Sequence, residues 1–150
     1  MPPGIRLLDV NVLVPLLWPP HTRHERAQDW FTPARLEGWA TCPLTELGCI
    51  RLLATPSVSQ TALDVRSAAR LLADSLTDAY HEFWPDDVAL TGGQFAASLP
   101  HIQGPRQLTD RYLLALAAAH GGTLATFDRA VAAGLPADSP LLAHLEVVED

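Results

Sequence analysis

The sequence predicts an α/β fold in which a mostly parallel sheet of four or five strands is covered by helices on both faces. Short apolar runs alternate with longer segments whose apolar residues recur at helical spacing, and this alternation is typical of parallel sheets. At 150 residues, with 48% hydrophobic and 18% charged residues, the chain has the length and composition of one globular domain. We therefore treat residues 1–150 as a single domain.

Five apolar runs have the length expected of strands. They cover residues 5–9, 38–41, 80–84, 123–127 and 145–148. The first run ends in Asp9 and the fourth leads into Asp128, as expected of buried strands with polar tips. Two strands of the predicted sheet therefore carry an acid at the carboxyl end.

The segments between these runs have apolar residues three or four positions apart, which predicts helices. The helices are expected over residues 24–36, 43–54, 61–76, 87–99 and 109–120. Pro33 should end the first helix early, and Pro43 suits the first position of the second. Thr61 with Asp64 forms a capping box, and Thr109 is a cap residue. Gly92 and Gly93 weaken the helix over 87–99.

Composition excludes several classes of function. The net charge is -7, and all ten basic residues are arginine, because the chain has no lysine. A Walker A loop and a Schiff-base lysine are therefore excluded, and the acidic balance argues against nonspecific coating of nucleic acid. No apolar run approaches the roughly 20 residues of a membrane span, so we expect a cytoplasmic protein. Cys42 and Cys49 have no second pair and indicate core residues.

Four acids are expected near one edge of the sheet. Asp9 and Asp128 end strands, and Glu46 and Asp110 lie in the first turns of helices that begin at the same edge. Each acid alone has a simpler explanation, because strand-end aspartates cap turns and first-turn acids complement the helix dipole. However, Glu46 and Asp110 share helix faces with apolar residues, and inward carboxylates repel one another and lose hydration. A divalent cation such as Mg²⁺ or Mn²⁺ resolves both problems.

Four sequence blocks follow one another along the chain. They are LLDVNVLVPL at 7–16, H-x-x-A-x-x-W-F at 24–31, TELGCIRLL at 45–53 and LTDRYLLALAAAHGGTLATFDRA at 108–130. Together they resemble the PIN-domain ribonucleases and are most similar to the VapC toxins of bacterial type II toxin–antitoxin systems. The last block is the most specific of the four. The resemblance implies a PIN-like three-layer sandwich with a parallel sheet of four or five strands.

The resemblance also implies roles for individual residues. The catalytic and metal-binding acids of the family match Asp9, Glu46, Asp110 and Asp128. Asn11 and Thr126 match polar residues that hold the first and last acids in place, and Arg51 matches a recurrent arginine. Arg111 stands where many relatives have alanine. We name Arg51, Arg106 and Arg111 as candidates for contact with RNA.

A function and a set of partners follow from the same resemblance. The family implies an endoribonuclease toxin that hydrolyses RNA phosphodiester bonds with Mg²⁺ or Mn²⁺ and is neutralised by a cognate VapB-like antitoxin. We expect a homodimer, with Trp30 and Phe31 contributing apolar surface, and a hetero-oligomer with the antitoxin. The antitoxin is expected to place an amphipathic helix beside residues 43–54 and 61–76 and to extend an arginine towards the acids.

The residues leave two other functions open. A catalytically silent PIN-like module that binds proteins would keep the fold but would not need the four acids. A phosphatase of the haloacid dehalogenase type is suggested by Asp9 at a strand end. That chemistry requires an acid where Asn11 stands and usually a lysine, which the chain lacks. The acids therefore favour the nuclease.

Overall fold

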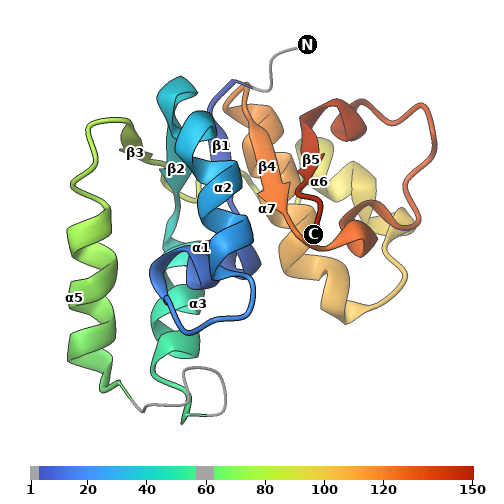
Figure 1. The fold of residues 1–150 in the computed structure, drawn as a ribbon. Coiled ribbons are helices and arrows are strands. Elements are labelled where there is room, and N and C mark those ends of the chain that lie inside the picture. The colour runs from blue at the N-terminus through green and yellow to red at the C-terminus, as the bar shows by residue number, and fades with distance from the viewer. Residues whose placement is uncertain (1–3, 57–62) are drawn as a thin grey trace.

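The computed structural model describes residues 4–56 and 63–150 (Figure 1). Five strands form one sheet in the order β3-β2-β1-β4-β5. The strands are β1 (Arg6–Leu8), β2 (Trp39–Thr41), β3 (His81–Phe83), β4 (Thr123–Thr126) and β5 (Leu145–Val147). All four neighbouring pairs are parallel. The predicted α/β class is confirmed, with five strands in the sheet.

Helices cover both faces of this sheet. The helices are α1 (Val10–Leu17), α2 (His24–Ala34), α3 (Pro43–Leu53), α5 (Val65–Ser75), α6 (Gly93–Ser98) and α7 (Leu108–Ala119). One buried cluster joins the sheet to α1, α2, α3 and α5, and a second joins it to α6 and α7. Because successive strand residues point to opposite faces, Leu7 belongs to the second cluster and Leu8 to the first. The result is a three-layer sandwich.

The order of the strands fixes where a site can form. The chain runs from β1 to β2 to β3 on one side and then returns to place β4 on the other side of β1. This reversal creates a crevice at the carboxyl ends of β1 and β4, the position where open parallel sheets bind ligands. Asp9 follows β1 directly, and Asp128 lies two residues after β4. Both strand-end acids therefore border the crevice.

Helix α1 is the element that the sequence did not predict. Its sequence, VNVLVPLL, is apolar almost throughout, and residues 12–16 are all buried. A helix surrounded by protein shows no polar face, so the helical period that reveals surface helices is absent. Pro15 inside the helix further obscures the pattern.

Several predicted boundaries were wrong. The helix expected over 87–99 is confined to α6, which Gly92 caps, while Gly93 begins it with a φ of 70°. Thr61 lies outside the described residues, and Asp64 itself caps α5 by accepting a hydrogen bond from the Ser67 backbone N–H. Helix α7 begins at Leu108, so Thr109 is inside it rather than capping it. These differences leave the order of elements unchanged.

In the sequence, Leu47, Ile50, Leu53 and Ala54 recur at helical spacing and predict the buried face of α3, but the structure shifts that face. Leu47 is 60% exposed, whereas Thr45, Cys49 and Leu53 are buried. Cys42 and Cys49 are both buried and free, as predicted for core residues, and burial raises the pKa of each thiol. Over residues 4–56 and 63–150, no helix combines the length and apolar character that crossing a membrane requires.

Candidate active site

Asp9 is the most buried acid at the crevice and has a fixed orientation. Its side chain is 6% exposed. Its Oδ1 accepts a hydrogen bond from the Val10 backbone N–H at 2.7 Å, and its Oδ2 accepts one from Thr126 Oγ1 at 2.8 Å. Burial raises the pKa of Asp9, the bonds from Thr126 and Val10 oppose that rise, and the charge of Asp128 adds to it. Asp9 is thus held in place while its negative charge is disfavoured.

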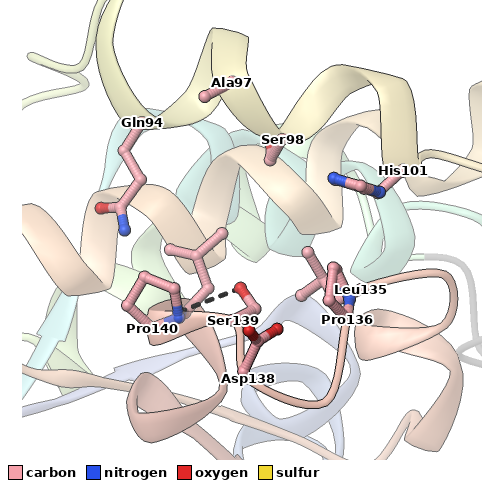
Figure 2. A pocket seen from close by; sticks show the side chains of 10 residues that line it. Gln94, Ala97, Ser98, His101, Leu135, Pro136, Asp138, Ser139 and Pro140 are labelled. Atoms are coloured by element: carbon pink, nitrogen blue, oxygen red, sulfur yellow. Dashed lines mark hydrogen bonds between the residues drawn. The ribbon is translucent and has the colours of Figure 1, made fainter.

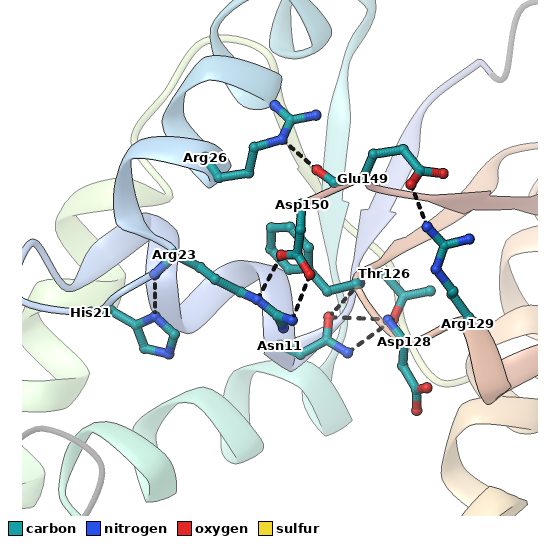
Figure 3. A network of polar contacts seen from close by, with 10 residues as sticks. Asn11, His21, Arg23, Arg26, Thr126, Asp128, Arg129, Glu149 and Asp150 are labelled. Atoms are coloured by element: carbon teal, nitrogen blue, oxygen red, sulfur yellow. Dashed lines mark hydrogen bonds and ion pairs between the residues drawn. The ribbon is translucent and has the colours of Figure 1, made fainter.

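Asn11 and Thr126 join the ends of β1 and β4. Asn11 Nδ2 donates to Thr126 Oγ1 at 2.9 Å, and Asn11 Oδ1 accepts from the Phe127 backbone N–H at 3.0 Å. Thr126 Oγ1 also accepts from the Asp128 backbone N–H at 3.0 Å. Figure 3 shows Asn11, Thr126 and Asp128 meeting at this point. Thr126 therefore contacts both the first and the last acid, and Asn11 contacts Thr126 and, at 3.4 Å, Asp9 Oδ2.

Asp110 and Asp128 complete a group that we call the aspartate cluster (Asp9, Asp110 and Asp128). Asp110 lies in the first turn of α7, and Asp128 caps a short 3₁₀ helix, η4 (Arg129–Ala132), by accepting from the Ala130 backbone N–H at 2.8 Å. Burial raises the pKa of Asp110 to about 6, and the charges of Asp9 and Asp128 add to the effect. The three carboxylates are close enough to repel one another.

Glu46 lies one strand away from this cluster. Its Oε2 accepts a hydrogen bond from Thr41 Oγ1 at 2.7 Å, at the end of β2. Thr41 Oγ1 is also 2.8 Å from His81 Nε2. Burial lowers the pKa of His81, and the charge of Glu46 opposes that effect. Glu46 as a fourth ligand stays a prediction, because in this structure Thr41 binds its carboxylate.

Comparisons with known proteins agree with this geometry. The PIN domain profile matches residues 6–133, a range that contains all four predicted acids. Ribonuclease VapC39 of Mycobacterium tuberculosis is 47% identical over 126 residues, which cover 84% of this chain and 90% of the relative. The chain belongs to the VapC ribonucleases of the PIN-domain family. Ribonucleases VapC38 and VapC44 of the same organism are 44% and 41% identical, over 83% and 84% of this chain and 86% and 87% of the relatives.

In this VapC-family chain, Arg111 is not at the surface where the predicted contact with RNA would be made. The residue is fully buried, and its guanidinium donates to the backbone oxygens of Ser98 at 3.2 Å and Ala133 at 3.0 Å. Burial lowers its pKa. The side chain lies between α6, α7 and the end of η4. The other two candidates, Arg51 on α3 and Arg106 before α7, are exposed.

Gln107 supports the same junction as Arg111. Its Nε2 donates to the backbone oxygens of Ala130 at 3.1 Å and Ala133 at 3.2 Å. Gln107 and Arg111 flank Asp110 in sequence, and η4 begins directly after Asp128. These hydrogen bonds therefore fix the start of α7, which carries Asp110, against the segment that follows Asp128.

A separate cavity of about 300 Å³ lies between α6 and residues 135–141 (Figure 2). Asp138, the next acid in the sequence after Asp128, lines it together with Gln94, Ser98 and His101. None of the four predicted acids lines this cavity. Asp138 is thus part of a different surface from the aspartate cluster.

The aspartate cluster has the donor chemistry of a divalent-cation site. Its carboxylates offer hard oxygen ligands, and a cation would relieve both their repulsion and the cost of removing Asp9 and part of Asp110 from water. Within residues 4–56 and 63–150, no three carboxylate, histidine or cysteine side chains are already arranged around a single point as metal ligands. The three aspartates therefore fit a divalent cation in the kind of ligand atom that they offer.

Proposed function

We propose that this protein is a divalent-metal-dependent endoribonuclease and the toxin of a toxin–antitoxin pair. The aspartate cluster carries the proposal: it lies at the crevice between β1 and β4, in a chain whose relatives are named VapC ribonucleases. Mutual repulsion among neighbouring carboxylates, of which Asp9 is buried, has no benefit for stability, so it supports a cationic partner. RNA phosphodiester hydrolysis is the reaction that fits both observations.

The proposed mechanism assigns a task to each side chain. Asp9, Asp110 and Asp128 would hold Mg²⁺ or Mn²⁺ through carboxylate oxygens. When bound, such a cation lowers the pKa of a coordinated water and offsets charge on the leaving oxygen. Thr126 Oγ1 and Asn11 Nδ2 both donate to Asp9 Oδ2, at 2.8 Å and 3.4 Å, and so keep Asp9 in one orientation. Glu46, held by Thr41, would complete the site from α3.

The proposal is tested by RNA cleavage with purified protein. Asp9→Asn or Asp110→Asn should reduce cleavage at least about 100-fold, because each removes a charge that faces the reacting phosphate through the cation. Asp138→Asn, which changes an acid in the separate cavity, is the matched control and should cleave like wild type. Sequencing of RNA ends should find 5′-phosphate and 3′-hydroxyl products. Wild-type rates in either cluster variant would contradict the assignment.

The same acids suggest how an antitoxin would inhibit the enzyme. An arginine of the antitoxin would pair with the aspartate cluster and compete with the cation. A position for the antitoxin helix beside 43–54 and 61–76 stays a prediction, and these two segments form α3 and α5, which contact each other. A cavity of about 470 Å³ lies between α1, α2 and α5, with Leu16, Phe31 and Trp39 in its lining. This cavity is our candidate for the antitoxin helix.

A homodimer also remains a proposal, with a different surface from the one first expected. Trp30 donates to Glu146 Oε2 at 3.0 Å, and Phe31 packs edge-on against Trp39 at 5.2 Å, so both are engaged within the chain. Exposed leucines instead surround a cavity of about 520 Å³ between α3, α6 and α7. They are Leu44, Leu90, Leu99 and Leu108. This apolar surface is the better candidate for a subunit contact.

A further inference from the structure

Three arginines gather at the carboxyl edge of the sheet and contact the same two acidic residues (Figure 3). Arg23 faces Asp150 with both prongs of its guanidinium, Nε to Oδ1 at 2.9 Å and NH2 to Oδ2 at 3.0 Å. Arg129 pairs with the carboxylate of Glu149, and Arg26 donates to the Glu149 backbone oxygen. We call Arg23, Arg26 and Arg129 the arginine strip, and Glu149 with Asp150 the acidic segment.

The arginine strip borders the aspartate cluster. Arg129 directly follows Asp128 in the chain. The guanidinium carbon of Arg23 lies 4.8 Å from the centre of the Phe127 ring, and the Phe127 backbone N–H binds Asn11 Oδ1. Arg23 and Arg129 therefore lie on either side of the strand end that carries Asp128. An RNA that reached the aspartate cluster would pass these cations.

The ion pairs of the strip are exposed to solvent. The side chains of Arg129 and Glu149 are 73% and 65% exposed, and those of Arg23 and Asp150 are 42% and 67% exposed. Exposed pairs of this kind contribute little to stability and exchange readily with other ions. The ion pair between Arg35 and Asp78, at the β2–β3 end of the molecule, is more buried, with exposures of 34% and 13%. The acidic segment can thus be displaced without disturbing the core.

The chemistry of the strip matches a phosphate. A guanidinium fork binds the paired oxygens of a carboxylate and of a phosphate in the same geometry, and the carboxylate of Asp150 already occupies such a position on Arg23. Over the whole chain acids outnumber bases, seventeen to ten, so binding a polyanion requires a local concentration of cations. The arginine strip provides such a concentration of positive charge beside the three aspartates of the aspartate cluster.

We propose that the arginine strip binds backbone phosphates of the RNA next to the bond that is cut, and that the acidic segment occupies the strip in the free protein. This inference rests on the proposed ribonuclease function. RNA must displace the two carboxylates before it reaches the aspartate cluster, so the apparent affinity for RNA is lowered by the fraction of protein in the occupied state. The acidic segment is an intramolecular competitor of the substrate.

The test measures RNA binding separately from cleavage. A fluorescently labelled, unstructured 12-nucleotide RNA is titrated with full-length protein in EDTA, and binding is followed by anisotropy over a range of salt concentrations. Arg23→Gln with Arg129→Gln should weaken binding about tenfold and reduce the salt slope by about 1.4, since each phosphate contact to a single strand contributes about 0.7. Arg66→Gln with Arg70→Gln, two exposed arginines of α5, is the control of equal charge and should change affinity less than about twofold.

The second arm removes the competitor. Glu149→Gln with Asp150→Asn should tighten RNA binding severalfold, and more than Asp74→Asn with Asp138→Asn, which removes two exposed acids elsewhere. Equal effects of the strip and control arginine pairs would overturn the phosphate site, and equal effects of the two acid pairs would overturn the competition. Cleavage in Mn²⁺ is scored independently: a wild-type protein that binds RNA through the strip but never cuts it refutes the ribonuclease function, not the strip.

Discussion

The two edges of the central sheet differ in how buried charges are paired. At the amino edge, Arg6 begins β1 and is 8% exposed, and it donates to Glu146 at 2.8 Å and Glu37 at 3.1 Å. At the carboxyl edge, three residues later, Asp9 is buried to the same degree, but Asp128 and Asp110 beside it are also negative. Arg6 at the start of the strand thus has oppositely charged partners, whereas Asp9 at its end has like-charged neighbours. We call the amino edge balanced and the carboxyl edge unbalanced in this sense.

The comparison separates a structural site from a functional one. Arg6 also donates to the backbone oxygen of Ala34, and Trp30 donates to Glu146, so the amino edge satisfies its charges within the chain. Such a network stabilises the fold and needs no ligand. Like charges held together raise the pKa values of their neighbours and cost folding free energy, so their retention indicates a task outside stability. The carboxyl edge is therefore where we propose that a cation binds.

The largest effect is expected from breaking the balanced edge. Arg6→Met should lower the free energy of unfolding by about 3 kcal/mol, because it leaves Glu146 and Glu37 without their cation in a partly buried network. Urea unfolding measures the change, and Arg70→Met on the exposed face of α5 is the control. A loss below about 1 kcal/mol would mean that the amino edge is not the structural site described here.

At the unbalanced edge, the stability of the folded protein should decrease as the pH rises, because the carboxylates repel one another when ionised. The folded-state pKa of Asp110, about 6, lies above the ordinary value of 3.8, so the folded protein holds this proton more tightly than the unfolded chain. In metal-free buffer its contribution to stability is therefore present below about pH 4 and is lost as the pH rises through 6. After allowance for solvent screening, the loss is on the order of 1–2 kcal/mol.

Asp110→Asn sharpens this prediction, because an amide of the same shape does not ionise. The variant should be more stable than wild type at pH 7, and its unfolding free energy should change less between pH 4 and pH 7. Thermal unfolding in EDTA across that range measures both. A wild-type protein that gains stability relative to the variant as the pH rises would show that Asp110 is not repelled in the folded state.

A smaller effect is expected at the junction that positions Asp110. Gln107→Ala removes the hydrogen bonds to Ala130 and Ala133 and should cost about 1–2 kcal/mol of stability. It should also weaken cation binding, since the start of α7 is no longer fixed against η4. Gln94→Ala, in the separate cavity, is the control. Unchanged cation affinity in a destabilised Gln107→Ala protein would limit the role of Gln107 to the fold.

The sequence predicted those parts of the site that depend on local position. Asp9 and Asp128 end strands, and the carboxyl ends of parallel strands lie at one edge whatever the details of packing. The position of Asp110 in the first turn of a helix was predicted from the helical spacing of the apolar residues in α7. Helix α1 was not predicted, because a helix buried on all sides has no amphipathic period.

The orientation of side chains depended on distant partners and could not be read from local patterns. The direction of Glu46 is set by Thr41 and the neighbouring His81, and the burial of Arg111 by the backbone of Ser98 and Ala133. The arginine strip was missed for the same reason, because Arg23 meets Asp150 across 127 positions of sequence. The local sequence around each of these arginines does not indicate which acid it will pair with.

The central claim is that the aspartate cluster binds a divalent cation, and calorimetric titration with Mn²⁺ at pH 7 tests it most directly. Wild-type protein should bind Mn²⁺ at the cluster, and Asp9→Asn and Asp110→Asn should each weaken that binding at least about tenfold, since each removes a charged oxygen ligand. Asp138→Asn should bind like wild type. Equal Mn²⁺ affinity in wild type and both cluster variants would contradict the account.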